Sequence, residues 1–167
     1  MVRVRFPAAV VIMPSFLPEK KYREILDLVP IVCVDICVRH NGKLLMIKRK
    51  NEPEKGAWWI IGGRIFKGET MEQAAFRKLK EETNLDRKHV VHIAGPFGPY
   101  ETMFKEAPFD ITTGVHSMNA VFLFDVDDII TLSVDNNHEG VLWATEIDER
   151  WHAYLKDVLA DCVFFLR

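Results

Sequence analysis

Two adjacent carboxylates, Glu81 and Glu82, fall in the last turn of a short predicted helix. Because the C-terminal end of a helix carries partial negative charge, acidic groups there are disfavoured by up to about 1 kcal/mol each. A cation that both carboxylates can reach removes this conflict. Hard oxygen ligands favour Mg²⁺, with Mn²⁺ as the alternative. The pair therefore indicates a site for a divalent cation.

The helix that would hold these carboxylates has recognisable ends. Thr70 followed three residues later by Gln73 is a capping-box pattern, which predicts a helix start near Met71. Asn84 is a residue type that stops a helix in a left-handed conformation. We therefore expect a short helix that starts near Met71 and stops at Asn84.

Glu82 falls on the apolar face of this helix when residues are spaced at about 100°. The apolar stripe comprises Met71, Ala74, Ala75 and Leu79. A carboxylate that faces a core must be paired, protonated or bound to a metal. A plain ion pair between Lys78 and Glu82, four residues apart, satisfies this need without a metal. Spacing alone leaves both interpretations open.

A double glycine precedes the helix. Gly62 and Gly63 follow the apolar run 57–61, which we expect to be a buried strand. Glycines after a strand let the backbone approach a ligand or ion closely. The loop 64–68 then brings Arg64 and Lys67 beside the acidic helix. Strand, glycine turn, basic loop and acidic helix together predict a metal and a phosphate held side by side.

The segment 62–85 resembles the signature of the Nudix hydrolases. The matching positions are Gly63, Glu69, Arg77, Leu79, Glu81, Glu82 and Leu85. Lys78 stands where the family has glutamate, and Asn84 stands where it has glycine. The resemblance implies an α/β (α+β) fold, with a mixed β-sheet sandwiched between α-helices. We expect a single domain over residues 1–167, with an N-terminal extension and short helix at 1–29 and the core at 30–167.

A closer resemblance, to the GDP-mannose mannosyl hydrolase branch, extends from about residue 17 to residue 143. It includes the runs 30–35, 43–49, 56–64, 109–113 and 137–143. Arg64 directly after the double glycine and His138 five residues before Trp143 are marks of that branch. In this branch water attacks the anomeric carbon with inversion, and the nucleoside diphosphate leaves. The resemblance thus implies a Mg²⁺-dependent hydrolase of GDP-mannose or a related nucleotide sugar.

The resemblance also implies roles for single residues. His138 would be the catalytic base, because histidine titrates near neutral pH. Arg77 is expected in the same catalytic set, and Arg49 and Arg64 would bind substrate by contacting diphosphate or sugar. Asp35 would accept hydrogen bonds from sugar hydroxyls or orient an arginine.

The same resemblance implies the metal ligands. Mg²⁺ would be bound by the Gly62 carbonyl and by Glu82, with Asn137 where the branch has a glutamine ligand. Glu81 is an additional carboxylate that could contribute. Ser117 occupies a place where a tyrosine is expected.

Other interpretations follow from single residues. Because Lys78 replaces a glutamate, one alternative is a Nudix diphosphatase that cleaves the P–O–P bond of a nucleotide sugar, ADP-ribose or a nucleoside triphosphate, using Glu81 and Glu82 with another base. A second alternative is a catalytically inactive nucleotide-binding module. Arg49 could instead belong to a solvated basic turn, and Asp35 to a structural ion pair.

Composition restricts the partners. The net charge of −2 over 167 residues argues against binding to a nucleic acid polymer. No apolar run is long enough to span a bilayer. The three cysteines show neither disulfide nor metal-ligand spacing, which favours a reducing, cytoplasmic location. The family resemblance implies a homodimer.

The remaining pattern predicts the elements around the site. We expect helices at 20–28 and 149–165, strands at 31–39, 43–48, 58–61, 90–94, 116–126 and 141–145, and a hairpin turn at 40–42. The stretch 95–114 contains three prolines and reads as a long loop. Loops of that length in a compact domain are often substrate lids.

Overall fold

The computed structural model describes residues 17–127 and 138–164 of the chain. The helices are α1 (Glu19–Leu28), α2 (Met71–Thr83) and α3 (Ala153–Phe164), with short 3-10 turns at Arg87–His89 and Pro108–Asp110. The strands are β1 (Ile31–His40), β2 (Lys43–Arg49), β3 (Trp58–Trp59), β4 (Ile61–Arg64), β5 (Val90–Phe104), β6 (Val115–Val126) and β7 (His138–Ala144).

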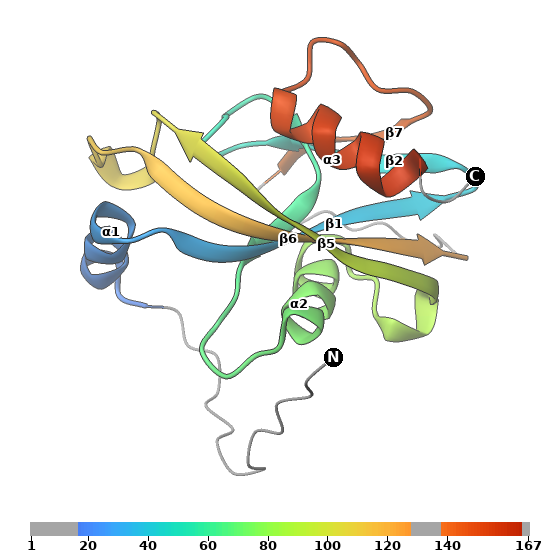
Figure 1. Ribbon diagram of the computed structural model, residues 1–167, viewed down its shortest axis with the longest axis horizontal. Coiled ribbons are helices and arrows are strands. Elements are labelled where there is room, and N and C mark those ends of the chain that lie inside the picture. The colour runs from blue at the N-terminus through green and yellow to red at the C-terminus, as the bar shows by residue number, and fades with distance from the viewer. Residues whose placement is uncertain (1–16, 128–137, 165–167) are drawn as a thin grey trace.

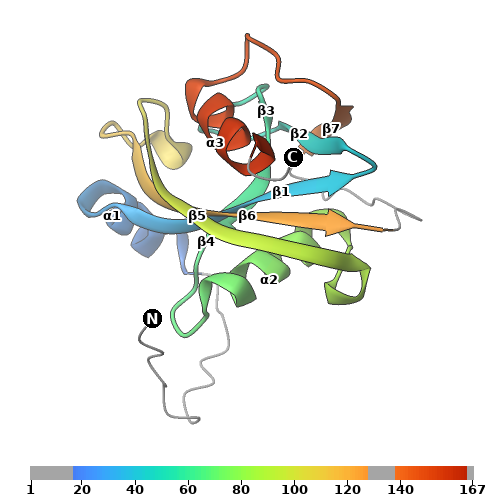
Figure 2. The same cartoon turned by 45° about the vertical axis from the view of Figure 1, so that its right-hand side comes forward.

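The strands form one mixed sheet that forks beside the first hairpin. Its main path runs β3-β2-β1-β6-β5, and β1 is parallel to β6. Next to the hairpin turn β1 pairs with β2, but further along β1 pairs with β4 and β2 pairs with β3. On its other side β2 pairs with β7 from Leu44 to Arg49. Figure 2 shows β1 with β4 and β2 with β3 and β7 as the two arms of this fork.

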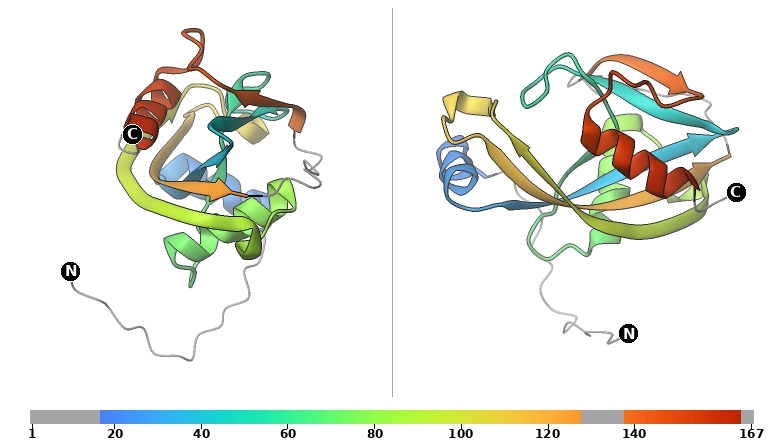
Figure 3. Two further views of the ribbon diagram at one scale, coloured as in Figure 1. Left: turned by 90° about the vertical axis from the view of Figure 1, so that its right-hand side faces the viewer. Right: turned by 45° about the horizontal axis from the view of Figure 1, so that its top comes forward.

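Helices cover both faces of the sheet, as the family resemblance implies. α2 lies on one face and α3 on the other (Figure 1), and the turned views agree (Figure 3). One buried cluster joins α2 to the sheet through Ala74, Ala75 and Leu79. A second cluster joins α3 to the opposite face through Leu155 and Val158. The predicted fold, a mixed sheet between helices, is confirmed.

The ends of α2 are where the sequence predicts them. Thr70 and Gln73 form both hydrogen bonds of a capping box, and Asn84 adopts the left-handed conformation with φ 60°. Met71 is the exception to the predicted apolar stripe, because it is 44% exposed in the first turn. Glu82 is buried, as the helical spacing indicates.

The predicted loop at 95–114 is wrong over its first half. β5 continues to Phe104 and pairs with β6 throughout, with register shifts between Ala94 and Phe97 and between Phe97 and Tyr100. Prolines are tolerated there because β5 is an edge strand and the shifts fall at the two Gly-Pro pairs. The irregular stretch is therefore limited to residues 105–114.

This shorter loop is fastened to α1. Arg23 donates a hydrogen bond to the Phe109 carbonyl, the Tyr22 and Phe109 rings meet edge to face, and Thr113 donates to Asp27 at 2.6 Å.

Within the described residues, no helix is long and apolar enough to cross a membrane.

The closing helix begins later than predicted. α3 starts at Ala153 rather than at residue 149, because Asp148 accepts hydrogen bonds from the backbone and side chain of Arg150 and forms a local turn. Such side-chain bonds compete with helix formation.

Candidate active site

A cavity of about 290 Å³ opens in the fork of the sheet. β1 contributes Asp35 to its wall, β2 contributes Arg49, and the β4 turn contributes Gly62 and Arg64. Glu82 reaches it from α2. The structure thus brings together five of the residues that the sequence singles out.

The double glycine lets β4 approach Asp35 closely. Gly62 lies opposite Asp35 in the β1–β4 pairing. A Cβ at position 62 would overlap Asp35 Oδ1 and would lie 2.6 Å from the Val34 carbonyl oxygen. Gly63 has φ +152°, and a Cβ there would lie 3.1 Å from Lys78 Cε. Packing against β1 therefore requires Gly62, whereas the positive φ at position 63 is what favours glycine there.

Lys78 pairs with both carboxylates of the acidic helix. Its Nζ lies 2.6 Å from Glu82 Oε1 and 3.2 Å from Glu81 Oε2. The Glu82 side chain is only 6% exposed, whereas that of Glu81 is 40% exposed. Burial opposes a charged lysine, but these two ion pairs raise the pKa of Lys78 above its ordinary value. The ion pair that the sequence offers as an alternative to a metal is therefore present.

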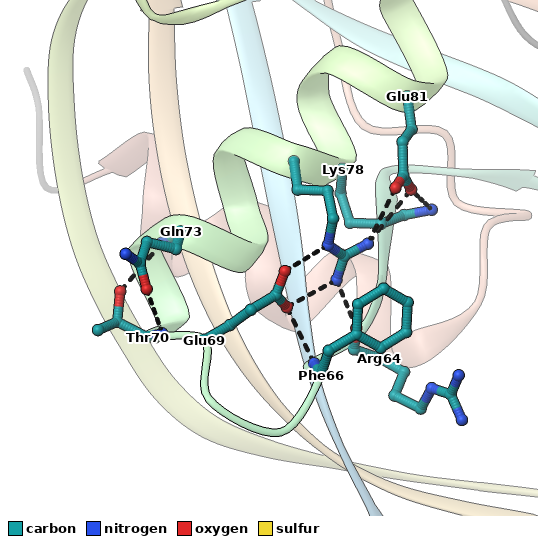
Figure 4. A network of polar contacts seen from close by, with 8 residues as sticks. Arg64, Phe66, Glu69, Thr70, Gln73, Lys78 and Glu81 are labelled. Atoms are coloured by element: carbon teal, nitrogen blue, oxygen red, sulfur yellow. Dashed lines mark hydrogen bonds and ion pairs between the residues drawn. The ribbon is translucent and has the colours of Figure 1, made fainter. Parts of the chain in front are cut away.

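Arg77 forms hydrogen bonds with the loop that connects the double glycine to α2. Its Nε and Nη2 donate to the Glu69 carboxylate at 2.6 and 2.9 Å, and Nη2 also donates to the Arg64 carbonyl at 3.0 Å. Figure 4 shows Glu69 reaching from this loop toward α2, with Glu81 and Lys78 further along the helix. Arg77 and Glu81 line a second hollow beside the main cavity, not the cavity itself. Arg64 and Lys78 line both.

Two guanidinium groups at the main cavity have no acidic partner at contact distance among the residues that the structure describes. Within the part of the chain that the structure describes, the buried Nε of Arg49 has no hydrogen-bond partner. The Arg49 guanidinium lies over the Trp59 ring, 5.7 Å from its centroid. Arg64 stacks on Tyr22 and Phe66, at 4.4 and 5.0 Å from the ring centroids. Cations held on aromatic faces in this way keep their donors available to an anion.

Asp35 is tied to α3 at the floor of the cavity. Tyr154 donates a short hydrogen bond to Asp35 Oδ2. Burial raises the pKa of Asp35 to about 6, although the Tyr154 bond and the charges of Arg49 and Lys78 work in the opposite direction. Asp35 is therefore buried, and it forms no direct ion pair with any of the described residues.

An uncharged polar cluster also lines the cavity. Thr102 Oγ1 lies 2.6 Å from Ser117 Oγ, Ser117 donates to Asn119 Oδ1 at 3.2 Å, and Asn119 donates to Thr102 at 3.4 Å. All three side chains are buried, and Trp59 and Phe104 also line the cavity. Of this cluster, only Ser117 is a position that the family resemblance singles out. A usable signal exists, because Ser117 and Asn119 are polar residues on the inward-facing positions of an apolar strand.

The comparison with known families matches the chain to the NUDIX domain over residues 29–162. The chain belongs to the Nudix family. The expected enzyme class, a Nudix hydrolase, is thereby confirmed at the level of the family.

Named relatives agree with this assignment. The low-salt glycan biosynthesis protein Agl8 of Haloferax volcanii is 30% identical over 143 residues, which cover 86% of this chain and 88% of that protein. The ADP-ribose pyrophosphatase of Methanocaldococcus jannaschii is 39% identical over 107 residues, which cover 64% of this chain and 56% of that protein.

A solved structure is similar as well. It is the bifunctional NMN adenylyltransferase/ADP ribose pyrophosphatase of Francisella tularensis complexed with AMP and Mn ion, with a TM-score of 0.58 and 25% identity. The match covers 85% of this chain but only 44% of that chain.

Two predicted residues of this Nudix protein belong to β7 and the segment before it. The backbone of His138 lies opposite Arg49 in the β2–β7 pairing, which brings it near a cavity residue. Asn137 lies outside the described residues.

Nudix enzymes generally use divalent metal ions. Among the residues described, no group of three or more His, Cys, Asp or Glu side chains is arranged to hold one. The carboxylates of Glu81 and Glu82 and the Gly62 carbonyl nevertheless offer hard oxygen donors. The Lys78 ammonium shows that this place already holds a positive charge next to both carboxylates. The chemistry of this corner therefore fits a small hard cation.

Proposed function

We propose that this Nudix hydrolase cleaves a nucleotide sugar, GDP-mannose or a related compound, by attack of water at the anomeric carbon. The products are the free sugar and a nucleoside diphosphate. One observation carries the proposal: a single cavity joins guanidinium groups that have no acidic partner among the described residues to a buried, uncharged polar cluster. A nucleotide sugar has the same division into an anionic diphosphate and neutral hydroxyl-bearing groups.

The cationic side of the cavity binds the diphosphate. Arg49 offers a buried donor with no partner among the described residues, and Arg64 is held on two aromatic rings. Guanidinium groups bind phosphate oxygens through paired, charge-assisted hydrogen bonds. Thr102, Ser117 and Asn119 lie where hydroxyl groups of the substrate can exchange hydrogen bonds with them.

His138 is the proposed base that takes a proton from the attacking water. Its backbone pairs with Arg49, so it belongs to the strand next to the cationic wall. His138→Ala is expected to lower kcat by roughly 10²–10⁴-fold, the usual contribution of a general base. Substrate affinity should hardly change. His92→Ala, on exposed β5, is the control; equal kcat in both variants would remove His138 from the mechanism.

Mg²⁺ or Mn²⁺ is the proposed cofactor. Glu82 and the Gly62 carbonyl would hold the ion, with Glu81 and Asn137 as further ligands. When bound, the ion neutralises charge on the departing diphosphate. The residues of this chain supply the rest: Arg49 and Arg64 orient the diphosphate, and His138 accepts the proton.

A screen of nucleotide sugars at saturating Mg²⁺, with product identification, tests the proposal. Release of free sugar and nucleoside diphosphate supports it. Tight binding of every compound without turnover would instead identify a non-catalytic nucleotide-binding module.

A second candidate function is cleavage of the diphosphate bond of a nucleotide sugar, ADP-ribose or a nucleoside triphosphate. It is favoured by the names of two similar proteins, both ADP-ribose pyrophosphatases. In the same screen this activity would release a nucleoside monophosphate, together with a sugar phosphate when the compound is a nucleotide sugar.

A further inference from the structure

Lys78 departs from the Nudix signature, and its ammonium lies against both carboxylates of that signature. Nζ is 2.6 Å from Glu82 Oε1 and 3.2 Å from Glu81 Oε2. We propose that Lys78 competes with the divalent cation for these carboxylates and thereby weakens metal binding by the substrate-free protein. This inference rests on the metal site named in the proposed function.

The position of Lys78 makes simultaneous occupancy costly. The Glu82 side chain is 6% exposed, so a cation can approach it from few directions. An ammonium in contact with Oε1 covers one of the two oxygens. A divalent cation on the same carboxylate would lie within a few ångströms of the ammonium, where two positive charges repel each other strongly in partly buried surroundings.

The lysine is also held in the corner by its aliphatic chain. Cε packs against the glycine turn, since a Cβ on Gly63 would lie 3.1 Å from it. The side chain therefore fills the space between the turn and the acidic helix, which is the corner assigned to the metal. Lys78 additionally lines both hollows at the site.

Titration of the substrate-free protein with Mn²⁺, followed by electron paramagnetic resonance of the unbound ion, measures this competition directly. Lys78→Gln keeps most of the aliphatic chain and removes the charge. Lys80→Gln is the matched control on the same helix, because Lys80 Nζ donates to the Asn84 carbonyl at 3.1 Å and lies 3.8 Å from Asp86. Circular dichroism and thermal melting establish that each variant is folded.

We expect Lys78→Gln to bind Mn²⁺ about tenfold or more tightly than the unaltered chain. Lys80→Gln should differ by less than about twofold, because exposed charges are well screened. Adding Glu82→Gln to Lys78→Gln should abolish the gain. Unchanged or weaker binding in Lys78→Gln, or an equal gain in Lys80→Gln, would overturn the proposal.

A measurement on the unaltered chain keeps the test valid if Lys78→Gln does not fold. Nuclear magnetic resonance can observe the lysine ammonium groups, and the Lys78 signal is assigned as the one that disappears in Lys78→Arg. Adding Mg²⁺ should shift the Lys78 signal and leave the Lys80 signal unchanged. A Lys78 signal that stays fixed while Mg²⁺ saturates the protein contradicts competition. Neither experiment needs substrate, so a failure of the proposed reaction and a failure of this inference are distinguishable.

Discussion

At the scale of single residues, the sequence predicts which side chains meet but not what each one pairs with. Spacing indicates that Glu82 is buried and needs a partner, and it leaves Lys78 and a metal as alternatives. The structure shows the Lys78 pair. Asp35 interrupts an apolar strand, which signals a buried carboxylate, yet its partner Tyr154 comes from a helix 119 residues away. Local pattern contains no signal for such a contact.

Asp35 should make stability depend on pH. Burial raises the pKa of Asp35 from 3.8 to about 6 in the folded protein, so the folded state binds the proton more tightly than the unfolded state. The contribution of Asp35 to the free energy of unfolding is therefore greatest below about pH 4, falls as pH rises to about 6, and stays low above that. The loss amounts to roughly 2–3 kcal/mol.

Asp35→Asn removes this dependence, because the amide does not titrate. In metal-free buffer, the free energy of unfolding of the variant relative to the unaltered chain should shift in favour of the variant by roughly 2–3 kcal/mol between pH 4 and pH 7. Urea titrations at both pH values measure it. A constant difference would show that the carboxyl is not perturbed.

Arg49 should matter for binding and not for stability. Arg49→Met keeps an aliphatic side chain but removes the guanidinium, and charge-assisted hydrogen bonds of about 1.5–3 kcal/mol correspond to roughly 10–100-fold weaker binding. Calorimetric titration with nucleoside diphosphate measures the loss.

Because the buried Nε lacks a partner among the described residues, the free energy of unfolding of Arg49→Met should be unchanged or higher. Arg150→Gln, at an exposed turn, is the control; equal affinities in both variants would exclude Arg49 from the site.

At the scale of elements, the sequence predicts best where the signals are local. The capping box, the left-handed Asn84 and the hairpin turn at 40–42 fix three boundaries, and all are observed. β5 shows the opposite case. Its prolines read as a loop, but pairing with β6 continues through them, and this pairing depends on a strand that comes later in the chain.

The C-terminal stop of α2 offers a direct stability test. Asn84 has φ 60°, which glycine adopts without strain and alanine adopts at a cost of about 1 kcal/mol. Asn84→Ala should therefore lower the free energy of unfolding by about that amount, while Asn84→Gly should leave it unchanged or slightly higher. Thermal melting of the two variants decides the matter: equal melting temperatures would contradict the left-handed cap.

At the scale of the whole molecule, the fork of the sheet creates the site. β1 and β2 separate beyond their hairpin, and β4 takes the place beside β1, so residues from β1, β2, β4 and α2 surround one cavity. The family resemblance predicts Arg49, Asp35 and Gly62 at the site, and all three line this cavity, whereas the positions of Thr102 and Tyr154 depend on how distant elements pack. The homodimer and the cytoplasmic location stay predictions. The three cysteines, on which the prediction of location rests, are buried and free.

The central claim is that water attacks carbon and not phosphorus. Product identification alone does not decide this, because attack on the β-phosphorus also yields free sugar and nucleoside diphosphate. Turnover of the best nucleotide sugar in ¹⁸O-enriched water, followed at once by mass spectrometry, does. We expect the label in the released sugar and none in the diphosphate; label in a phosphate product, with an unlabelled sugar, would contradict the account.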